Sequence, residues 1–415
     1  MIESVGTLNG RRVVIEARWV LPISQPPIES GWVEIQHGRI LAVGGPHDAP
    51  RTVHRASRER HIAILPGLVN AHTHLELSYL HERIPPAPSF GQWVSAVMKT
   101  RSQYPDPADP AIVEPARQAI AYAQATGTVL FGEVSNTLVT APLLREGGVA
   151  AQIFHELTGF TEQDPEARVR EARARADAAA GGDVRVSVAP HAPYSVSASL
   201  FKAIRVDLDA HAGAVSSVHL GETPEEIELL RDGGGAIRQV LERLGRWPAG
   251  WTPPGVGPVD YLTGLGVLDR RMLAVHGVQF KDGDLRRLRD LGVTIVSCPR
   301  SNVYVGVGAP PLEAFYAAGS DVAFGTDSLA SVADLNMLAE LHEARRIAPS
   351  IPARRLLESA TRIGARALGF DAEFGTIEPG KRAALVAVAV PDEVRDVEEY
   401  LVNGVQPDRV QRLDW

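Results

Sequence analysis

Two histidines end an apolar run near residue 70. The stretch "LPGLVNAHTHLELSYL" spans Leu65 to Leu80, and its apolar part gives way to His72 and His74. Residues i and i+2 of a strand point to the same side, so both imidazoles would leave one strand end together. Paired imidazoles suit a metal ion better than an apolar core. The spacing therefore predicts a metal site at this strand end.

Polar residues also follow apolar runs later in the chain. His219 comes after "AVSSV" and Asp327 comes after "VAFGT". Six of the 13 histidines fall at predicted strand ends, namely His72, His74, His155, His191, His219 and His276. We predict that His72, His74, His219 and Asp327 bind one divalent metal ion. Three imidazoles and one carboxylate favour Zn²⁺, with Fe²⁺ or Mn²⁺ as alternatives, and the metal would supply hydroxide near neutral pH.

These residues depend on a repeating pattern of elements for their positions. Eight short β-rich runs, from "ILPGLVNAH" to "SDVAFGTDS", each end in polar residues and are followed by a helical stretch. This alternation predicts an α/β fold, a parallel (β/α)8 barrel over residues 65–369, with its active site at the C-terminal strand ends. A segment rich in Gly and Pro at 231–266 is expected to cover part of the barrel mouth, in a conformation left open.

The two ends of the chain have a different pattern. Residues 11–43 and 375–390 read as strands joined by turns, and neither piece has enough apolar surface to fold alone. We predict that residues 1–64 and 370–415 form one small composite β-sandwich domain.

Composition narrows the class of protein. The chain has 415 residues, 45% of them hydrophobic, and a net charge of −8 without a basic cluster, which argues against a nucleic-acid surface. No run approaches the roughly 18 apolar residues of a membrane span, and the start has no apolar signal segment. Cys298 is the single cysteine, so no internal disulfide is expected. We predict a cytoplasmic protein with a small-molecule substrate and leave a homodimer open.

A set of motifs resembles a known family. "PGLVNAHTH", "HLGE", "LAVHGV" and "FGTDS", in this order on successive strands, resemble the amidohydrolase superfamily. "GTIEPGKRAALV" is similar to the return strand of that family, with Ala384 in place of the usual Asp. Within the superfamily the chain is most similar to the branch of nucleoside deaminases and chlorohydrolases. "HTHLELS" and "GTDSLAS" look like the aminodeoxyfutalosine deaminases.

The resemblance implies roles for the strand-end residues. It gives the metal to His72, His74, His219 and Asp327, and it makes Glu222 the proton shuttle. His276 would hydrogen-bond the attacking water or the tetrahedral centre, and Asp327 or Glu222 would accept a proton from that water. The fourth strand lacks the lysine that bridges two metals in binuclear members, so one metal is expected. A structural alternative for Glu222 is the N-cap of the helix in "TPEEIELLRD".

Five further residues are candidates for substrate binding: Glu76, Trp93, His191, Arg300 and Asn302. Glu76 suggests contacts with ribose hydroxyls, and His191 would face the sugar or the base. Arg300 is suited to bidentate binding of a carboxylate, such as the benzoate of aminodeoxyfutalosine. The alternatives are a helix-core role for Trp93, a structural role for His191 and a surface position for Arg300. Glu133 is expected to be structural or substrate-facing.

The predicted activity is that of an aminohydrolase acting on carbon–nitrogen bonds of cyclic amidines. Metal-bound hydroxide would attack a 6-aminopurine nucleoside and release ammonia, with 6-aminodeoxyfutalosine of menaquinone biosynthesis as the first candidate. An aromatic amidine needs ring protonation, which the Glu of His-x-x-Glu can provide. Alternatives are a deaminase of adenosine, methylthioadenosine, adenosylhomocysteine or guanine, and a chlorohydrolase or amidase on the same scaffold. A non-catalytic binding protein would be expected to lack metal ligands.

Overall fold

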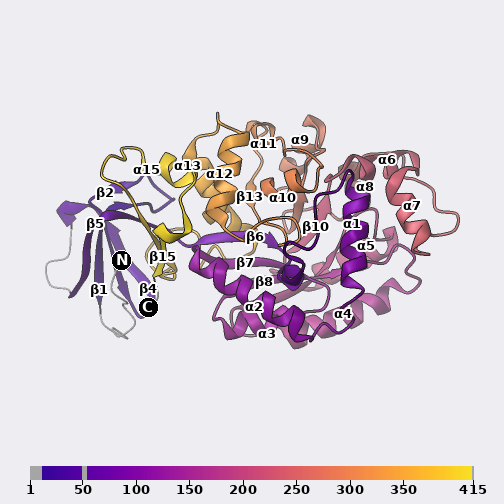
Figure 1. Cartoon of the computed structure of the whole chain (residues 1–415), viewed down its shortest axis with the longest axis horizontal. Helices are drawn as coiled ribbons and strands as arrows, with labels where there is room; N and C mark the ends of the chain where they lie inside the picture. Colours follow the sequence, from indigo (N-terminus) through magenta and orange to yellow (C-terminus); the bar gives the residue numbers. More distant parts are fainter. Residues whose placement is uncertain (1–11, 49–53, 414–415) are drawn as a thin grey trace. The chain divides into compact units, whose positions relative to one another are not determined.

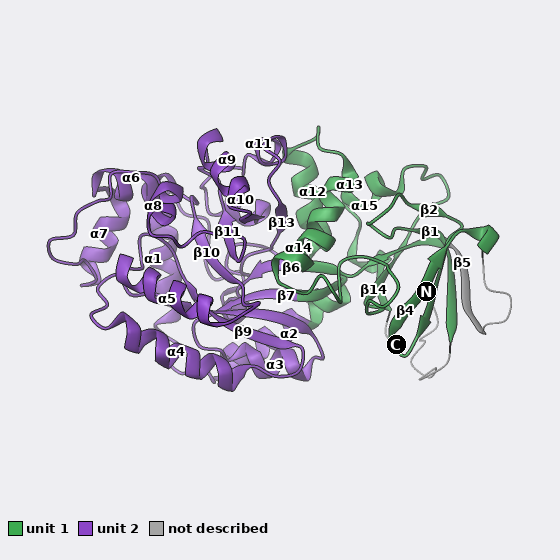
Figure 2. Cartoon of the chain, turned by 180° about the vertical axis from the view of Figure 1, so that it is seen from behind, with its two compact units in different colours: residues 1–70, 121–130, 336–415 green, residues 71–120, 131–335 purple. Residues whose placement is uncertain are grey.

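The chain divides into two compact units. The computed structural model describes residues 12–48 and 54–413. One unit takes residues 1–70, 121–130 and 336–415, and the other takes residues 71–120 and 131–335 (Figure 2). This division follows contacts within the chain, and it does not test the predicted domain bounds at residues 64 and 370.

Strands from both chain ends share one sheet in the first unit. Its order is β15-β14-β5-β1-β3-β4, with β2 paired to β1. The strands are β1 (Val13–Val20), β2 (Ile28–Glu29), β3 (Trp32–Gln36), β4 (Arg39–Gly44), β5 (His54–Pro66), β14 (Leu385–Ala389) and β15 (Val410–Leu413). Leu385 of β14 lies opposite Pro66 of β5 in antiparallel register, which joins the two chain ends. The described strands form a single sheet, so the predicted β-sandwich is not confirmed.

The same unit carries four short helices after residue 336. They are α12 (Met337–Ile347), α13 (Ala353–Glu358), α14 (Gly364–Ala367) and α15 (Val397–Val402). Its sheet has a core of buried aliphatic side chains, including Ile15, Val33, Ile64 and Leu385. Alternating apolar residues in β1 and β3 supply this face, as expected for strands with one buried side.

Eight further strands form two four-stranded sheets (Figure 1). One has the order β6 (Leu68–Thr73), β7 (Thr128–Ser135), β8 (Ala150–Leu157) and β9 (Val184–Pro190). The other has the order β10 (Ser216–Leu220), β11 (Met272–His276), β12 (Thr294–Ser297) and β13 (Val322–Phe324). Pairing is parallel between β8 and β9 and throughout the second sheet.

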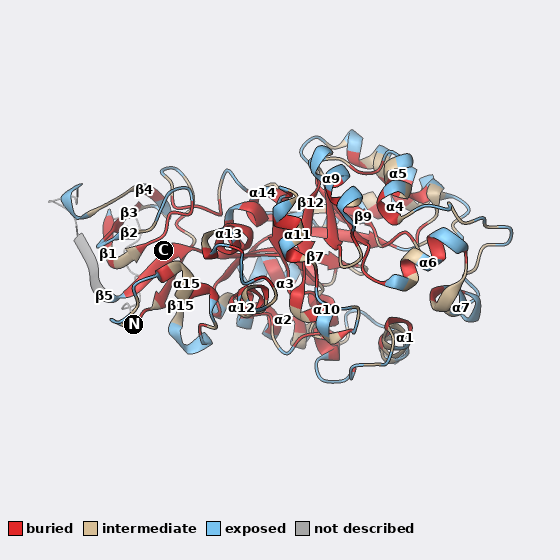
Figure 3. Ribbon diagram, turned by 90° about the horizontal axis from the view of Figure 1, so that it is seen from above, coloured by how far each residue is buried: buried red, intermediate tan, exposed pale blue. Residues whose placement is uncertain are grey.

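Backbone hydrogen bonds connect the two sheets at both edges. The His219 amide donates to the His191 carbonyl at 2.9 Å, and the Asp327 amide donates to the His72 carbonyl at 3.0 Å. Every residue of β6, β7 and β8 is buried, and Figure 3 shows β7 and β12 in the buried colour. Continuous burial is typical of parallel strands with helices outside them. The arrangement is a TIM-barrel-like α/β fold, as the alternating pattern predicts.

Helices separate these strands along the chain. They are α1 (Phe90–Arg101), α2 (Pro110–Ala125), α3 (Thr140–Glu146), α4 (Pro165–Ala179), α5 (Ala198–Ala210), α6 (Pro224–Asp232), α7 (Gly235–Arg243), α8 (Pro258–Gly264), α9 (Asp282–Asp290), α10 (Pro299–Tyr304) and α11 (Leu312–Ala317). The segment 231–266 therefore contains two helices, α7 and α8. Among the described residues, none of the helices has the length and apolar content that crossing a bilayer requires.

Candidate active site

Four strand-end residues meet at one place. The ring centroid of His72 lies 4.9 Å from that of His74 and 5.0 Å from that of His219. Potential ligand atoms of these three histidines all lie within 4.8 Å of one another. Oδ1 of Asp327 is 3.8 Å from Nε2 of His72 and 3.5 Å from Nε2 of His74. The structure thus brings together the four residues that the sequence indicates as metal ligands.

The chemistry of this cluster fits a divalent metal ion. The His72 side chain is fully buried, and neither of its ring nitrogens has a hydrogen-bond partner. Burial, and then the neighbouring histidines, lower the pKa of His72 well below its ordinary value, so the ring is neutral. An unpaired buried polar group is costly, whereas a neutral imidazole is a good metal ligand. A metal ion would bind one of the two ring nitrogens of His72 that lack a hydrogen-bond partner.

Two site residues have an unusual backbone conformation. Asp327 has a φ of 61° and His276 has a φ of 76°, a region that residues other than glycine rarely adopt. Hydrogen bonds hold Asp327 in place: Ser301 Oγ donates to Oδ2 at 2.6 Å, and Thr73 Oγ1 donates to the Asp327 carbonyl at 2.9 Å. Strained residues concentrate at functional sites, and both of these lie at the end of a barrel strand.

Glu222 is a buried acid beside this cluster. Burial, and then the charge of Asp327, raise the pKa of Glu222 well above its ordinary value. Its backbone N–H donates to Oε2 of Glu226 at 3.1 Å. The N-cap of α6 is Thr223, whose side chain accepts from Glu225 N–H, so Glu222 is not the helix cap. The Glu222 side chain lines the cavity instead of capping the helix.

His276 lies next to Glu222, and its other ring nitrogen contacts Asn302. Its Nε2 is 3.6 Å from Oε1 of Glu222, and its Nδ1 accepts from Nδ2 of Asn302 at 3.0 Å. Burial, and then the neighbouring histidines, lower the pKa of His276 well below its ordinary value. Because Nδ1 faces the Asn302 donor, a neutral ring carries its hydrogen on Nε2. Asn302 is buried and is not among the residues that line the cavity. Asn302 thus contacts His276, and the binding of substrate by Asn302 stays a prediction.

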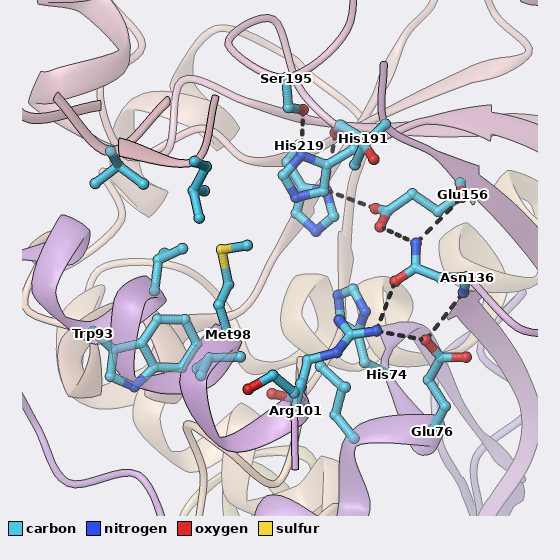
Figure 4. Close-up of a pocket in the computed structure, with 18 of the residues that line it drawn as sticks. His74, Glu76, Trp93, Met98, Arg101, Asn136, Glu156, His191, Ser195 and His219 are labelled. Atoms are coloured by element: carbon cyan, nitrogen blue, oxygen red, sulfur yellow. Dashed lines mark hydrogen bonds and ion pairs between the residues drawn. The ribbon is translucent and has the colours of Figure 1, made fainter. Parts of the chain in front are cut away.

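A cavity of about 630 Å³ opens onto these groups. Its polar lining includes His74, His219, Glu222, His276 and Asp327. Its apolar wall comes from α1 and α7 and includes Trp93, Val94, Val97, Met98, Ile237, Val240 and Leu241 (Figure 4 labels Trp93 and Met98). His191 also lines the cavity, and its Nδ1 is 2.6 Å from Ser195 Oγ. Trp93 and His191 thus lie where the sequence predicts substrate contacts.

Glu76 lines the same cavity, but its carboxylate is already engaged. Oε2 accepts from Ser135 Oγ at 2.6 Å and from Thr137 Oγ1 at 2.7 Å. The amides of Asn136 and Thr137 donate to the two oxygens at 3.1 Å each. Three of these four hydrogen bonds end on Oε2 and one on Oε1, so Glu76 holds the loop after β7, and its contact with ribose hydroxyls stays a prediction.

Arg300 contacts a neighbouring aspartate. Its guanidinium donates to the Asp334 carboxylate at 2.7 Å and to the Asp334 carbonyl at 2.7 Å. It is not among the residues that line the cavity. Two of the five N–H donors of Arg300 are thus engaged by Asp334, and binding of a substrate carboxylate by Arg300 stays a prediction. Glu133 is structural: its carboxylate accepts from Leu75 N–H at 2.8 Å and from Thr140 Oγ1 at 3.1 Å.

Several cavity residues are missing from the sequence prediction. Arg101, Asn136, Glu156 and Tyr194 line the cavity, and Ser301 holds Asp327. Glu156 could have been found, because it ends the apolar run "AAQIF" directly after His155. No motif or periodic pattern in the sequence indicates that Arg101 and Asn136 line the cavity.

Comparisons with known proteins identify the family of the chain. Residues 63–410 match the model of the amidohydrolase family. The chain is 32% identical over 369 residues to an aminodeoxyfutalosine deaminase of Deinococcus radiodurans, covering 83% of this chain and 82% of that protein. It is 29% identical to a 5-methylthioadenosine/S-adenosylhomocysteine deaminase of Moorella thermoacetica, with 96% and 92% covered.

Solved structures show the same fold. An adenosine deaminase from Xanthomonas campestris with bound zinc superposes with a TM-score of 0.82 at 27% identity, covering 97% of this chain and 91% of that one. A Helicobacter pylori aminofutalosine deaminase in complex with methylthio-coformycin has a TM-score of 0.84 at 23% identity, with 97% of each chain covered. The ordered motifs, the strand-end cluster and the extent of the family match lead to one conclusion: the chain belongs to the amidohydrolase family.

Proposed function

We propose that the chain is a deaminase of 6-aminopurine nucleosides that uses one divalent metal ion, Zn²⁺ first among the candidates. The observation that carries this proposal is Glu222, a buried carboxyl with a raised pKa that faces the same cavity as the predicted ligands. Hydrolysis of an aromatic amidine needs such an acid to protonate the ring, whereas hydrolysis of an amide does not. The deaminases among the relatives support the same reading.

The proposed mechanism assigns a proton role to each residue. A metal ion held by His72, His74, His219 and Asp327 would make a water molecule nucleophilic near neutral pH. Glu222 is protonated because its pKa is raised, and it donates to the ring nitrogen beside the amine-bearing carbon. Asp327 accepts a proton from the water, and His276 donates a hydrogen bond from Nε2. The proton taken up by Asp327 then moves to the amine, and the second proton of the water returns to Glu222. The carbon–nitrogen bond breaks, so that ammonia leaves and the oxygen of the water remains on the ring as a carbonyl.

Among nucleosides, we propose 6-aminodeoxyfutalosine first, with methylthioadenosine, adenosylhomocysteine and adenosine as alternatives. The apolar wall from α1 and α7 and the cavity volume of about 630 Å³ favour a nucleoside with a large 5′ substituent over adenosine itself. The deaminase of D. radiodurans named above supports this order. Guanine and chlorinated triazines rank lower.

The domain bounds, the kind of partner and the location in the cell are part of the same proposal. We propose that residues 65–369 form the catalytic barrel and that residues 1–64 and 370–415 form a composite β-sandwich domain. The net charge of −8 supports an enzyme that acts on a small molecule without a nucleic-acid partner. A cytoplasmic location is part of the proposal.

A substrate panel tests the proposal. Purified protein is loaded with zinc, its metal content is measured, and it is given adenine nucleosides, guanine and a triazine. We expect about one metal ion per chain, ammonia release and loss of the adenine absorbance band, fastest for nucleosides with a 5′ substituent. Turnover of guanine or the triazine, with none of any adenine nucleoside, would contradict the substrate class. A metal content near two would contradict the mononuclear site.

A further inference from the structure

Glu156 is a buried carboxylate that the proposed mechanism does not use. It lies near the C-terminal end of β8, is 7% exposed and lines the cavity. Its Oε1 is 3.4 Å from Nδ1 of His219, and its Oε2 accepts from Nδ2 of Asn136 at 2.9 Å. Figure 4 shows Glu156 between these two residues, with an interaction to each.

The surroundings of His219 determine which nitrogen carries its hydrogen. Nδ1 lies 3.0 Å from the His191 carbonyl oxygen, which can only accept. Nδ1 therefore carries the hydrogen, and the lone pair on Nε2 remains free for a metal. Oε1 of Glu156 lies 3.4 Å from the same Nδ1, close enough for its charge to favour a hydrogen on that nitrogen, while the hydrogen bond itself goes to the His191 carbonyl. Carboxylates in this position orient metal-binding histidines and increase their basicity.

Glu156, His191 and His219 also have ligand atoms within 4.8 Å of one another, which raises the alternative of a second metal. The His219 nitrogen that faces Glu156 is Nδ1, and its hydrogen is directed at the His191 carbonyl. Nδ1 of His191 is engaged with Ser195 Oγ. The geometry thus favours Glu156 as a charged neighbour of the Nδ1–H group over Glu156 as a metal ligand.

Asn136 is fixed in the orientation that supports Glu156. Its Oδ1 accepts from Arg101 at 3.2 Å, so its Nδ2 must face the other way, toward Glu156. Its backbone N–H donates to Glu76 Oε1 at 3.1 Å, which holds the loop. Donors and acceptors therefore alternate from Arg101, at the end of α1, through Asn136 and Glu156 to His219.

We propose that Glu156 is a positioning residue that orients His219 for metal binding, and that Asn136 holds the Glu156 carboxylate in place. This inference rests on the proposed metal centre. It extends the metal site to two residues outside the predicted ligand set, and it predicts an effect on metal affinity in the absence of any substrate.

Three variants of the full chain test the inference by competition for zinc with a chromophoric chelator. Glu156→Gln replaces a carboxylate oxygen by an NH2 group, which would face the NH2 group of Asn136 with no acceptor between them. We expect zinc affinity to fall ~10–100-fold, because the side chain at 156 loses its charge and its fixed position beside His219. Asn136→Asp places two carboxylates against each other and should also weaken binding. The double variant Glu156→Gln/Asn136→Asp restores a donor opposite an acceptor and should recover most of the affinity.

Glu166→Gln is the matched control, since Glu166 is an exposed residue of α4. Thermal melts of the metal-free proteins show whether each variant is folded. Wild-type zinc affinity in folded Glu156→Gln would overturn the inference, and a double variant no better than either single variant would remove Asn136 from it. Wild-type protein that binds no zinc would contradict the proposed metal centre itself and the inference with it, a result distinct from the other two.

Discussion

At the scale of single residues, Glu222 shows how burial turns a common carboxyl into an acid. Its raised pKa keeps a proton available near neutral pH. Glu222→Gln retains the size of the side chain but cannot exchange that proton. We expect turnover to fall ~10²–10⁴-fold while zinc content stays at the wild-type level. Steady-state rates and elemental analysis check this, with Glu228→Gln on the exposed side of α6 as control. Unchanged turnover would leave Glu222 without a catalytic role.

Glu226 lies one turn further on and holds the backbone of Glu222. It is fully buried, and burial raises its pKa to about 8, although N–H groups of Gly221 and Glu222 lower it. The ordinary pKa is 4.5. Between these values the folded state binds a proton that the unfolded state has lost, so this carboxyl makes the free energy of unfolding fall as pH rises.

Glu226→Gln removes this proton. Relative to wild type, the variant should gain stability between about pH 5 and about pH 8, by up to ~1.4 kcal/mol per pH unit. Urea unfolding at several pH values measures the difference. Wild-type and variant curves that stay parallel across this range would show that Glu226 is ionised in the folded protein.

At the scale of elements, the approach of β13 to β6 depends on Gly325. A Cβ at this position would lie 2.6 Å from the His72 carbonyl oxygen and 2.7 Å from the His72 Cβ. Both are closer than ordinary contacts, and neither belongs to a flexible side-chain end. Gly325→Ala should therefore displace His72 or Asp327. We expect the free energy of zinc binding to be weakened at least as much as the free energy of unfolding.

Zinc competition and thermal melts of the metal-free protein check this prediction. Gly283→Ala is a suitable control, since Gly283 lies in α9 and a Cβ there would meet nothing within 4 Å. Normal zinc affinity in Gly325→Ala would show that the two strands can separate slightly without disturbing the site.

At the scale of the whole molecule, the predicted metal connects segments far apart in the chain. His72, His219 and Asp327 come from β6, β10 and the end of β13. A ligand that binds only the folded state stabilises it, by ~2.7 kcal/mol at a hundredfold excess over Kd. Chelation should lower the Tm, and added zinc should restore it. His72→Asn should lose most of this zinc-dependent shift, and an equal shift in both proteins would place the metal elsewhere.

The barrel-like fold and the residues of the cluster can be predicted from the sequence. Both depend on local patterns: strands alternate with helices, and His72, His74, His219 and Asp327 each follow an apolar run. The C-terminal ends of the parallel strands in a barrel lie on the same face. The convergence of residues at these ends can therefore be predicted without knowing how the side chains pack. Glu222 follows from the same logic, three residues after His219.

The surroundings of these residues could not be predicted from the sequence and are known from the folded structure. Whether Arg300 meets a substrate depends on Asp334, 34 residues away, and Asn302 turned out to support His276, 26 residues away. The hydrogen-bonded series from Arg101 through Asn136 to Glu156 likewise joins α1 to the ends of β7 and β8. Hydrogen-bond partners of this kind follow from distance and angle in the folded chain. The hydrophobic periodicity of the sequence does not predict these partners, because they come from distant parts of the chain and meet only when the strands and helices pack.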